Sequence, residues 1–294
     1  MKGSVLTAYI MTVLISSTTP LGIVWSSESV HPSMAVLLRM AIAAVLGLII
    51  IFVRKIELPR NPTAYKLYAF SGMGIFCGLL LTYMSARYLP SGTISLVFGL
   101  APIVSSLFAS RILGEEKFTG VRKIAITIAL FGLTLVCFDS LGYSSNSLLG
   151  IILLIIAVFF FCLSGVLVKS VKIVIHPLST TVGALLLTLP FFTLAWFLMD
   201  GTLPVNDWKP RSVWAIIYLG VFGSLIGFVS YFYILQNLAA STVALITLMT
   251  PITAVIIGVI FNAEIITFKF VIGAIFVMLG LGLFLFGHRL RLRF

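Results

Sequence analysis

The sequence predicts an all-α membrane protein with ten transmembrane helices in two inverted five-helix repeats. Of its 294 residues, 61% are hydrophobic and only 9% are charged, and the mean hydropathy is +1.21, whereas soluble domains are roughly half apolar. The chain also repeats itself, because the pattern of residues 67 to 137 recurs at an offset of 149 residues. Matched pairs are Gly74 with Gly223, Gly78 with Gly227, Pro102 with Pro251, and Glu115 with Glu264.

Ten apolar runs are long enough, or nearly so, to cross the hydrocarbon layer, which takes about 20 residues per helix. They are Leu6–Trp25, Ser33–Val53, Leu67–Ala86, Thr93–Leu113, Val121–Phe138, Leu148–Val168, Leu178–Met199, Val213–Leu235, Val243–Phe261 and Phe270–Gly287. Each half holds an odd number of runs, so the second copy is expected upside down relative to the first. We therefore predict a first repeat over residues 1–143 and a second over 144–294, an architecture typical of secondary transporters.

The basic residues predict the orientation. With ten spans, 14 Lys and Arg residues fall on the side of both termini, four fall on the other side, and Arg39 lies inside the second run. Cytoplasmic loops of membrane proteins are enriched in Lys and Arg, so both termini are expected in the cytoplasm, in a multi-pass protein of the cell (inner) membrane. The net charge of +11 is explained by this asymmetry and by contact with the lipid bilayer, and we assign no nucleic-acid partner.

The loops after the fourth and ninth runs carry matching glutamates. Glu115 and Glu264 each follow a run that has a proline in its middle. We expect both carboxylates to pair with nearby basic groups or with loop backbone, which is a structural role.

Two stretches resemble a known family. Thr93 to Val136, with its mid-helix proline and the Gly114-Glu115 pair at the exit, looks like the repeat of the EamA family in the drug/metabolite transporter superfamily, and Thr242 to Phe286 looks like a second copy. Arg39 also resembles an arginine that this family often carries. The sequence departs from the family at Asn262-Ala263-Glu264, where Gly-Glu is usual, and at Ser17-Thr18, where Trp-Gly is common. The resemblance implies two inverted bundles with a midplane cavity that moves amino acids, other small metabolites or drugs, commonly outward.

The most polar segment at membrane depth is Ser16-Ser17-Thr18-Thr19-Pro20. Pro20 has no N–H, so the carbonyl of Ser16 loses its helical partner, which is tolerable only inside protein or beside a water-filled cavity. We predict Ser16, Ser17 and Thr18 as substrate-binding residues, with Ser164 as a weaker repeat partner. The alternative is a kink whose hydroxyls bond back to the preceding turn.

Two mid-span prolines predict a second part of the site. Pro102 and Pro251 lie at equivalent positions and free the carbonyls of Phe98 and Thr247, and Thr250 lies beside the second proline. Broken or kinked helices at matching places in two halves point to a transporter site. The alternative is that both prolines only shape helix packing.

Arg39 is the only ionisable residue clearly inside a run, and an intramembrane charge is a functional hypothesis by default. It could receive a substrate carboxylate or hold a helix end by bonding backbone carbonyls, and the ability of Arg to snorkel favours the second role. Tyr83 and Tyr231 are expected near helix ends, where aromatic belts occur, with substrate stacking as the alternative.

The absence of Asp and Glu from every run argues against antiport of cationic drugs. We expect a secondary transporter, acting as an exporter of small neutral or zwitterionic metabolites such as amino acids, by alternating access. The alternatives are a flippase for lipids or lipid-linked sugars, or a membrane scaffold that transports nothing. An enzyme is not expected, because His31, His176 and His288 lie at run ends and no GxSxG segment occurs. We expect no cofactor and no metal, and the sequence leaves the oligomeric state open.

Overall fold

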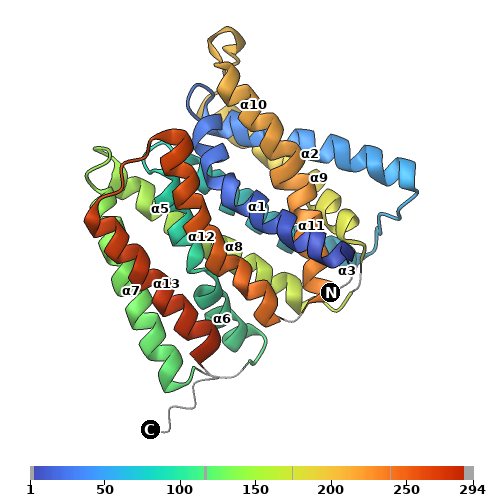
Figure 1. The fold of residues 1–294 in the computed structure, drawn as a ribbon. Coiled ribbons are helices and arrows are strands. Elements are labelled where there is room, and N and C mark those ends of the chain that lie inside the picture. The colour runs from blue at the N-terminus through green and yellow to red at the C-terminus, as the bar shows by residue number, and fades with distance from the viewer. Residues whose placement is uncertain (1–2, 116–117, 174, 239, 288–294) are drawn as a thin grey trace.

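The protein is described by a computed structural model that covers residues 3–115, 118–173, 175–238 and 240–287. Within these residues the secondary structure is entirely helical (Figure 1). The helices are α1 (Gly3–Ser26), α2 (Pro32–Arg54), α3 (Pro62–Met73), η1 (Gly74–Gly78), α4 (Leu79–Ser85), α5 (Ser91–Gly99), α6 (Ala101–Ile112), α7 (Gly120–Ser140), α8 (Ser147–Ser170), α9 (Pro177–Met199), η2 (Val205–Asp207), α10 (Pro210–Tyr218), η3 (Leu219–Ile226), α11 (Gly227–Asn237), α12 (Ala240–Asn262) and α13 (Phe268–Phe286).

Every predicted apolar run corresponds to a helical segment. Nine stretches within the described residues are long and apolar enough to span a membrane, and the ninth run corresponds to the shorter apolar helix Ile246–Asn262. The third helix begins five residues earlier than expected, at Pro62 instead of Leu67. The Asn61 side chain caps it by accepting the N–H of Ala64 at 2.7 Å, and Pro62 takes the first helical position, where a missing N–H costs nothing.

Three of the spans are interrupted α-helices, a feature that the apolar pattern of the sequence does not indicate. The third and eighth spans contain the π-helical segments η1 and η3, and the fourth span is divided at Leu100 into α5 and α6. The two π segments overlap the paired glycines of the internal repeat. Such wide turns inside α-helices occur frequently at functional sites.

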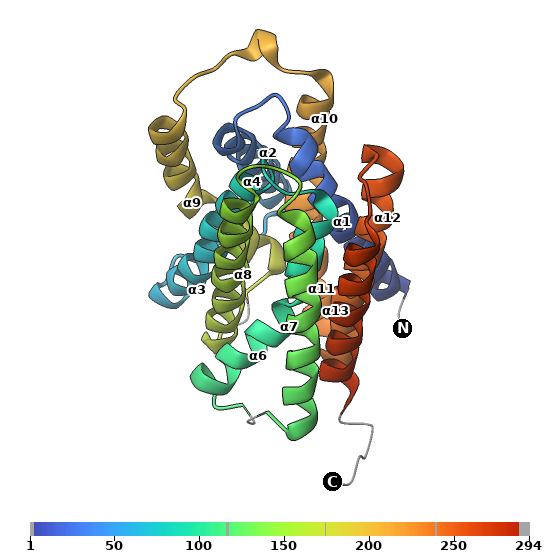
Figure 2. The same cartoon turned by 90° about the vertical axis from the view of Figure 1, so that its left-hand side faces the viewer.

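The helices pack through close contacts at glycine. The tightest pair is α7 with α13, which lie side by side in both views (Figures 1 and 2). A Cβ atom added at Gly132 would lie 2.5 Å from the Val277 nitrogen, and one at Gly280 would lie 2.5 Å from the Ala129 nitrogen. Since neither backbone can retreat, these glycines fix α7 and α13 as one unit. Apart from the packing of α7 with α13, a larger hydrophobic core forms around α2, α8 and α9.

Side-chain contacts join loops that are far apart in the sequence. We call the end that carries the loops 27–31, 86–90, 141–146, 200–209 and 263–267 the outer end, after the predicted topology, and the opposite end the inner end. At the outer end Ser29 donates to Ser212 at 3.0 Å and Thr267 donates to Asp139 at 2.6 Å. At the inner end the Ser179 hydroxyl donates to the Glu57 carbonyl at 2.7 Å.

The same C-terminal turn follows α6 and α12. Gly114 and Ala263, which correspond in the repeat, both adopt left-handed backbone angles, with φ of 69° and 51°. The next residue, Glu115 or Glu264, in each case donates its N–H to the carbonyl six residues earlier at 3.3 Å. Both helices therefore end in the same wide turn, in which glycine avoids the steric cost that alanine incurs at the left-handed position.

Candidate functional site

A polar contact connects α1 with α12 at the centre of the bundle. Ser17, which is 2% exposed, pairs through its hydroxyl with Thr253 and also donates to the Val13 carbonyl at 2.7 Å. The Thr253 hydroxyl also lies within bonding distance of the carbonyl of Thr250, one of the predicted site residues. Ser17 and Thr250 therefore lie on neighbouring helices around one group of hydroxyls.

The next residue of α1 contacts a different helix. The Thr18 hydroxyl lies 2.6 Å from the Tyr218 hydroxyl at the end of α10 and 3.1 Å from the carbonyls of Leu14 and Ile15. Hydroxyls of this segment thus bond back to the preceding turn, as one alternative predicted. Ser17 and Thr18 additionally bond across to α12 and α10, which an isolated kink would not explain. Ser16 is half-buried beside them.

The two predicted prolines have different effects on their helices. At Pro102 the fourth span is divided, and the Ile103 N–H donates to the carbonyl of Leu100 at 3.0 Å, whereas α12 runs as one helix through Pro251. The two segments approach closely here, because a Cβ atom on Gly99 would lie 3.1 Å from Cγ of Pro251. Pro251 therefore lies where α12 crosses the end of α5, and Pro102 lies just beyond it at the start of α6, but only the fourth span is broken.

Aromatic and sulfur groups lie next to the break. The Cys162 thiol on α8 donates to the carbonyl of Ala101 at 3.4 Å, and Phe98 makes an edge contact with Phe161 at 5.8 Å between ring centres. Tyr231 on α11 is 38% exposed. The contacts of Cys162 and Phe98 bring α5, α6 and α8 together at the depth of Pro102.

Ser164, the predicted repeat partner of the α1 segment, has a packing contact in this conformation. It is buried, and its hydroxyl donates to the carbonyl of Phe70 at 2.6 Å. Its side chain also lies directly against Gly74, the first residue of η1. Thr247 and Thr250 are half-buried on α12.

Arg39 is the largest fully buried side chain of the described residues, with 1% exposure. Its Nε donates to the Ser224 hydroxyl at 2.8 Å, and Nη1 donates to the Tyr83 hydroxyl at 3.5 Å. The guanidinium carbon lies 5.8 Å from the centre of the Tyr83 ring, within range of a cation–π interaction. The expectation that Arg39 snorkels to a helix end was wrong, because η3 offers a hydroxyl and Gly223 leaves room beside Nη2.

Tyr83 is fully buried, so its predicted place in an aromatic belt was also wrong. The sequence singled out Arg39 and Tyr83 for separate reasons, and the fold brings them together. Sequence reasoning missed Ser224 and Tyr218, the partners of Arg39 and Thr18. Their only signal was that both lie on the helix that carries the second repeat's glycines.

The other charged groups that the structure describes lie at the two ends. Lys169 pairs with Glu115 at 2.8 Å at the inner end, and Arg211 pairs with Glu28 at 3.4 Å at the outer end. Glu264 instead binds loop and helix backbone: its carboxylate accepts the N–H groups of Ser91 and Gly92 at 2.9 and 3.1 Å. These contacts confirm that both glutamates pair with basic groups or backbone.

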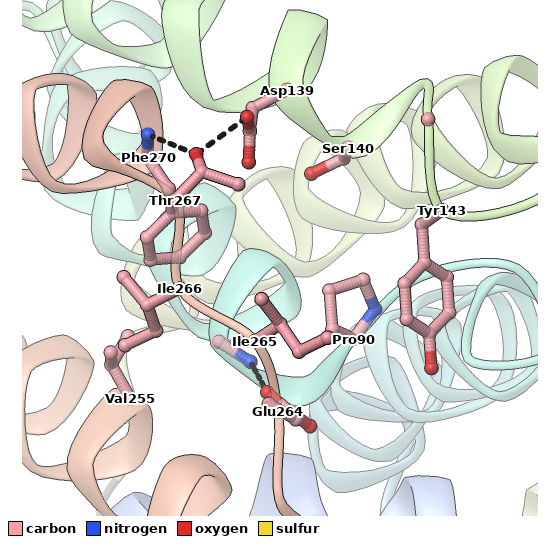
Figure 3. Close-up of a pocket in the computed structure, with 12 residues that line it drawn as sticks. Pro90, Asp139, Ser140, Tyr143, Val255, Glu264, Ile265, Ile266, Thr267 and Phe270 are labelled. Atoms are coloured by element: carbon pink, nitrogen blue, oxygen red, sulfur yellow. Dashed lines mark hydrogen bonds between the residues drawn. The ribbon is translucent and has the colours of Figure 1, made fainter.

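A pocket of about 250 Å³ lies at the outer end beside Glu264 (Figure 3). Asp139 at the end of α7 and Thr267 before α13 line it, and Thr267 also caps α13 by accepting the N–H of Phe270 at 3.1 Å. Burial, followed by the charge of Glu264, raises the pKa of the Tyr143 hydroxyl at the rim. The pocket is separate from the hydroxyl groups of α1 and α12.

Comparison with known proteins identifies relatives over most of the chain. The sequence model of the EamA-like transporter family matches residues 3–138 and again residues 148–286. An uncharacterized transporter of Archaeoglobus fulgidus is 27% identical, covering 87% of this chain and 90% of its own length. A probable amino-acid metabolite efflux pump of Escherichia coli is 24% identical over 69% of this chain and 70% of its own. A solved crystal structure with 18% identity has a TM-score of 0.69 and covers 99% of this chain and 100% of its own, which shows a shared fold.

Proposed function

Because the chain belongs to the EamA-like transporter family, we propose that it is a secondary transporter that exports small neutral or zwitterionic metabolites, such as amino acids, by alternating access. The protein crosses the membrane several times, and its relatives are named as transporters. We propose no catalytic role. The relative named as an amino-acid metabolite efflux pump supports amino acids as the first substrates to test.

Arg39 is the single observation that carries the substrate class. Its guanidinium is buried, and among the described residues it donates hydrogen bonds to two neutral hydroxyls, those of Ser224 and Tyr83. All eight acidic residues of the chain lie outside the ten apolar runs. A buried charge is costly unless an opposite charge compensates it. A carboxylate on the substrate would supply that charge, and the planar guanidinium is suited to bind it through two parallel hydrogen bonds.

The cluster of hydroxyl side chains on α1 and α12 supplies the other polar groups of the proposed site. Ser17 and Thr18 can each exchange a bond to Thr253 or Tyr218 for one to a substrate amine or amide, since the backbone carbonyls of α1 remain as alternative acceptors. Short contacts of this kind between helices allow polar groups at membrane depth to stay satisfied in either state.

We further propose that the two halves, residues 1–143 and 144–294, are inverted copies, with both termini in the cytoplasm. The matching turns at Gly114 and Ala263 and the π segments η1 and η3 support this arrangement. Two inverted halves around a midplane site would allow the protein to open alternately to each side.

Purified protein in liposomes tests the proposal. Vesicles loaded with an unlabelled amino acid should take up the same labelled amino acid by exchange, and empty vesicles without protein should not. A prior thermal-shift screen over amino acids, nucleosides and small amines would select the compound. If amino acids neither stabilise the protein nor exchange, while an unrelated solute or a lipid does, the proposed substrate class is wrong.

A further inference from the structure

We propose that Glu264 is a latch that holds the outer end closed by binding the N-terminus of α5, and that Glu115 is its counterpart for α12 in the oppositely open conformation. The proposal rests on the transporter function given above and adds the groups that gate it. Its first basis is the paired hydrogen bonds of the Glu264 carboxylate with the N–H groups of Ser91 and Gly92.

These two N–H groups are the first of α5, where the helix has no internal acceptors for them. The N-terminus of a helix also carries partial positive charge, so a carboxylate there is bound by both hydrogen bonding and the helix dipole. Glu264 is 173 residues from Ser91 and 172 residues from Gly92 in the sequence. Releasing α5 from α12 would therefore break a charge-assisted contact between the two halves of the chain.

The surroundings fit a carboxylate at this position. A Cβ atom on Gly258 would lie 2.6 Å from Oε2 of Glu264, so only glycine leaves space for it. Asn262 holds the other oxygen by donating to Oε1 at 3.2 Å. Glu264 follows the left-handed turn at Ala263, and its side chain binds the N-terminus of α5 (Figure 3).

Asn262 extends the latch to two further helices. Its side-chain oxygen accepts from the Trp25 ring nitrogen of α1 at 2.9 Å and from Arg211 of α10 at 3.1 Å. Arg211 in turn stacks over the Trp25 ring at 4.1 Å and pairs with Glu28. The outer ends of α1, α5, α10 and α12 are therefore joined through Asn262 and Glu264.

The inner end has the same turn without the same clamp. Glu115 follows Gly114 with the same backbone bond as Glu264, yet its carboxylate pairs with Lys169, and the side chains of Lys169 and Glu115 are 69% and 46% exposed. At the repeat offset of 149, Ser91 of α5 corresponds to Ala240, the first residue of α12. Glu115 thus lies at the end of α6 where an equivalent clamp on α12 would form when the inner end closes.

The test measures opening at the outer end directly. In a background with Cys77, Cys137 and Cys162 replaced by alanine, Ser91→Cys is the reporter, because the Ser91 hydroxyl is fully buried and has no hydrogen-bond partner among the described residues. Reaction of the detergent-purified protein with a water-soluble maleimide reports exposure of this position. Glu264→Gln keeps the shape of the side chain and removes its charge. We expect labelling about tenfold faster, a change that corresponds to about 1.4 kcal/mol.

The opposite latch supplies an effect of opposite sign. Adding Glu115→Gln to Glu264→Gln should return the labelling rate toward that of the parent, because the open conformation then loses its own clamp. Asp139→Asn is the matched control. It removes a carboxylate from the same pocket, but Asp139 binds Thr267 between α7 and α13, which pack as one unit, so the rate should not change.

Correct folding is verified with Ala129→Cys in place of Ser91→Cys. Ala129 is fully buried where α7 contacts α13, so this cysteine should remain unlabelled in every variant. Equal labelling of the parent and Glu264→Gln, with Ala129→Cys protected, would overturn the latch, as would acceleration by Asp139→Asn. The assay needs no substrate. Normal gating with no amino-acid exchange would refute the proposed substrate class alone, and exchange without altered gating would refute the latch alone.

Discussion

Replacing Arg39 by methionine separates a substrate-binding role from a packing role. Methionine fills similar space without charge, so the change removes a bond of 2.8 Å to Ser224 and a weak one of 3.5 Å to Tyr83. A hydrogen bond to a charged group contributes about 1.5–3 kcal/mol and a cation–π contact about 0.5–2 kcal/mol. Removing an arginine from inside a span recovers up to about 2.5–3.5 kcal/mol, the value at a helix centre. These terms nearly cancel.

We therefore expect the free energy of unfolding of Arg39→Met to lie within about 2 kcal/mol of that of the parent protein. Buried charges replaced by apolar groups behave in this way. Affinity for an amino-acid substrate should fall by roughly 10- to 150-fold, the equivalent of one charge-assisted hydrogen bond. The free energy of unfolding is measured in detergent, and affinity by titration calorimetry.

Arg39→Lys is the matched variant, because it keeps the charge but loses the planar two-pronged geometry. It should retain part of the affinity. If Arg39→Met lowers stability by more than about 3 kcal/mol while exchange per folded molecule is unchanged, Arg39 is a packing residue and the proposed carboxylate site is wrong.

Three further predictions concern the topology, the hydroxyl group and the turn after α12. Reporter fusions after Lys66 and after Asp139 should report the cytoplasm and the outside respectively, and the reverse result would refute the charge-based orientation. Ser17→Ala should change substrate affinity by up to roughly tenfold with the fold intact, whereas Ser17→Leu should abolish exchange, and equal exchange by both variants would remove Ser17 from the site. Ala263→Gly should raise the free energy of unfolding by roughly 0.5–1 kcal/mol, because glycine adopts the left-handed conformation without the steric cost of alanine. Gly114→Ala should lower the free energy of unfolding by a similar amount. Denaturation midpoints that do not move in opposite directions would contradict this prediction.

Features that depend on local sequence were predicted correctly. Ten runs of apolar residues correspond to ten helical segments because crossing a membrane requires nearly continuous apolar length, which any window of the sequence reveals. The prediction that Glu264 and Glu115 pair with backbone or with basic groups was confirmed, because a carboxylate at the end of a span needs a polar partner. Membership of the EamA-like family was also predicted from local patterns, which occur twice in the chain.

The partners of the site residues could not be predicted. Arg39 and Ser224 are 185 residues apart, and Ser17 and Thr253 are 236 apart. Nothing in either segment distinguishes Ser224 or Thr253 from the other hydroxyls of the chain. Which hydroxyl meets which depends on the rotation and crossing of whole helices, and these are set by the summed packing of many apolar side chains.

Backbone breaks were equally beyond the sequence. Pro102 and Pro251 are equivalent in the repeat, yet only the first divides its helix. Proline removes one hydrogen bond in either place, and the neighbouring helices decide how the freed carbonyls are satisfied. The sequence by itself determined how many apolar helical segments form and, to within five residues, where each begins and ends, because those depend on local polarity. Only the tertiary structure decided which polar groups face one another, because that depends on contacts between helices distant in the chain.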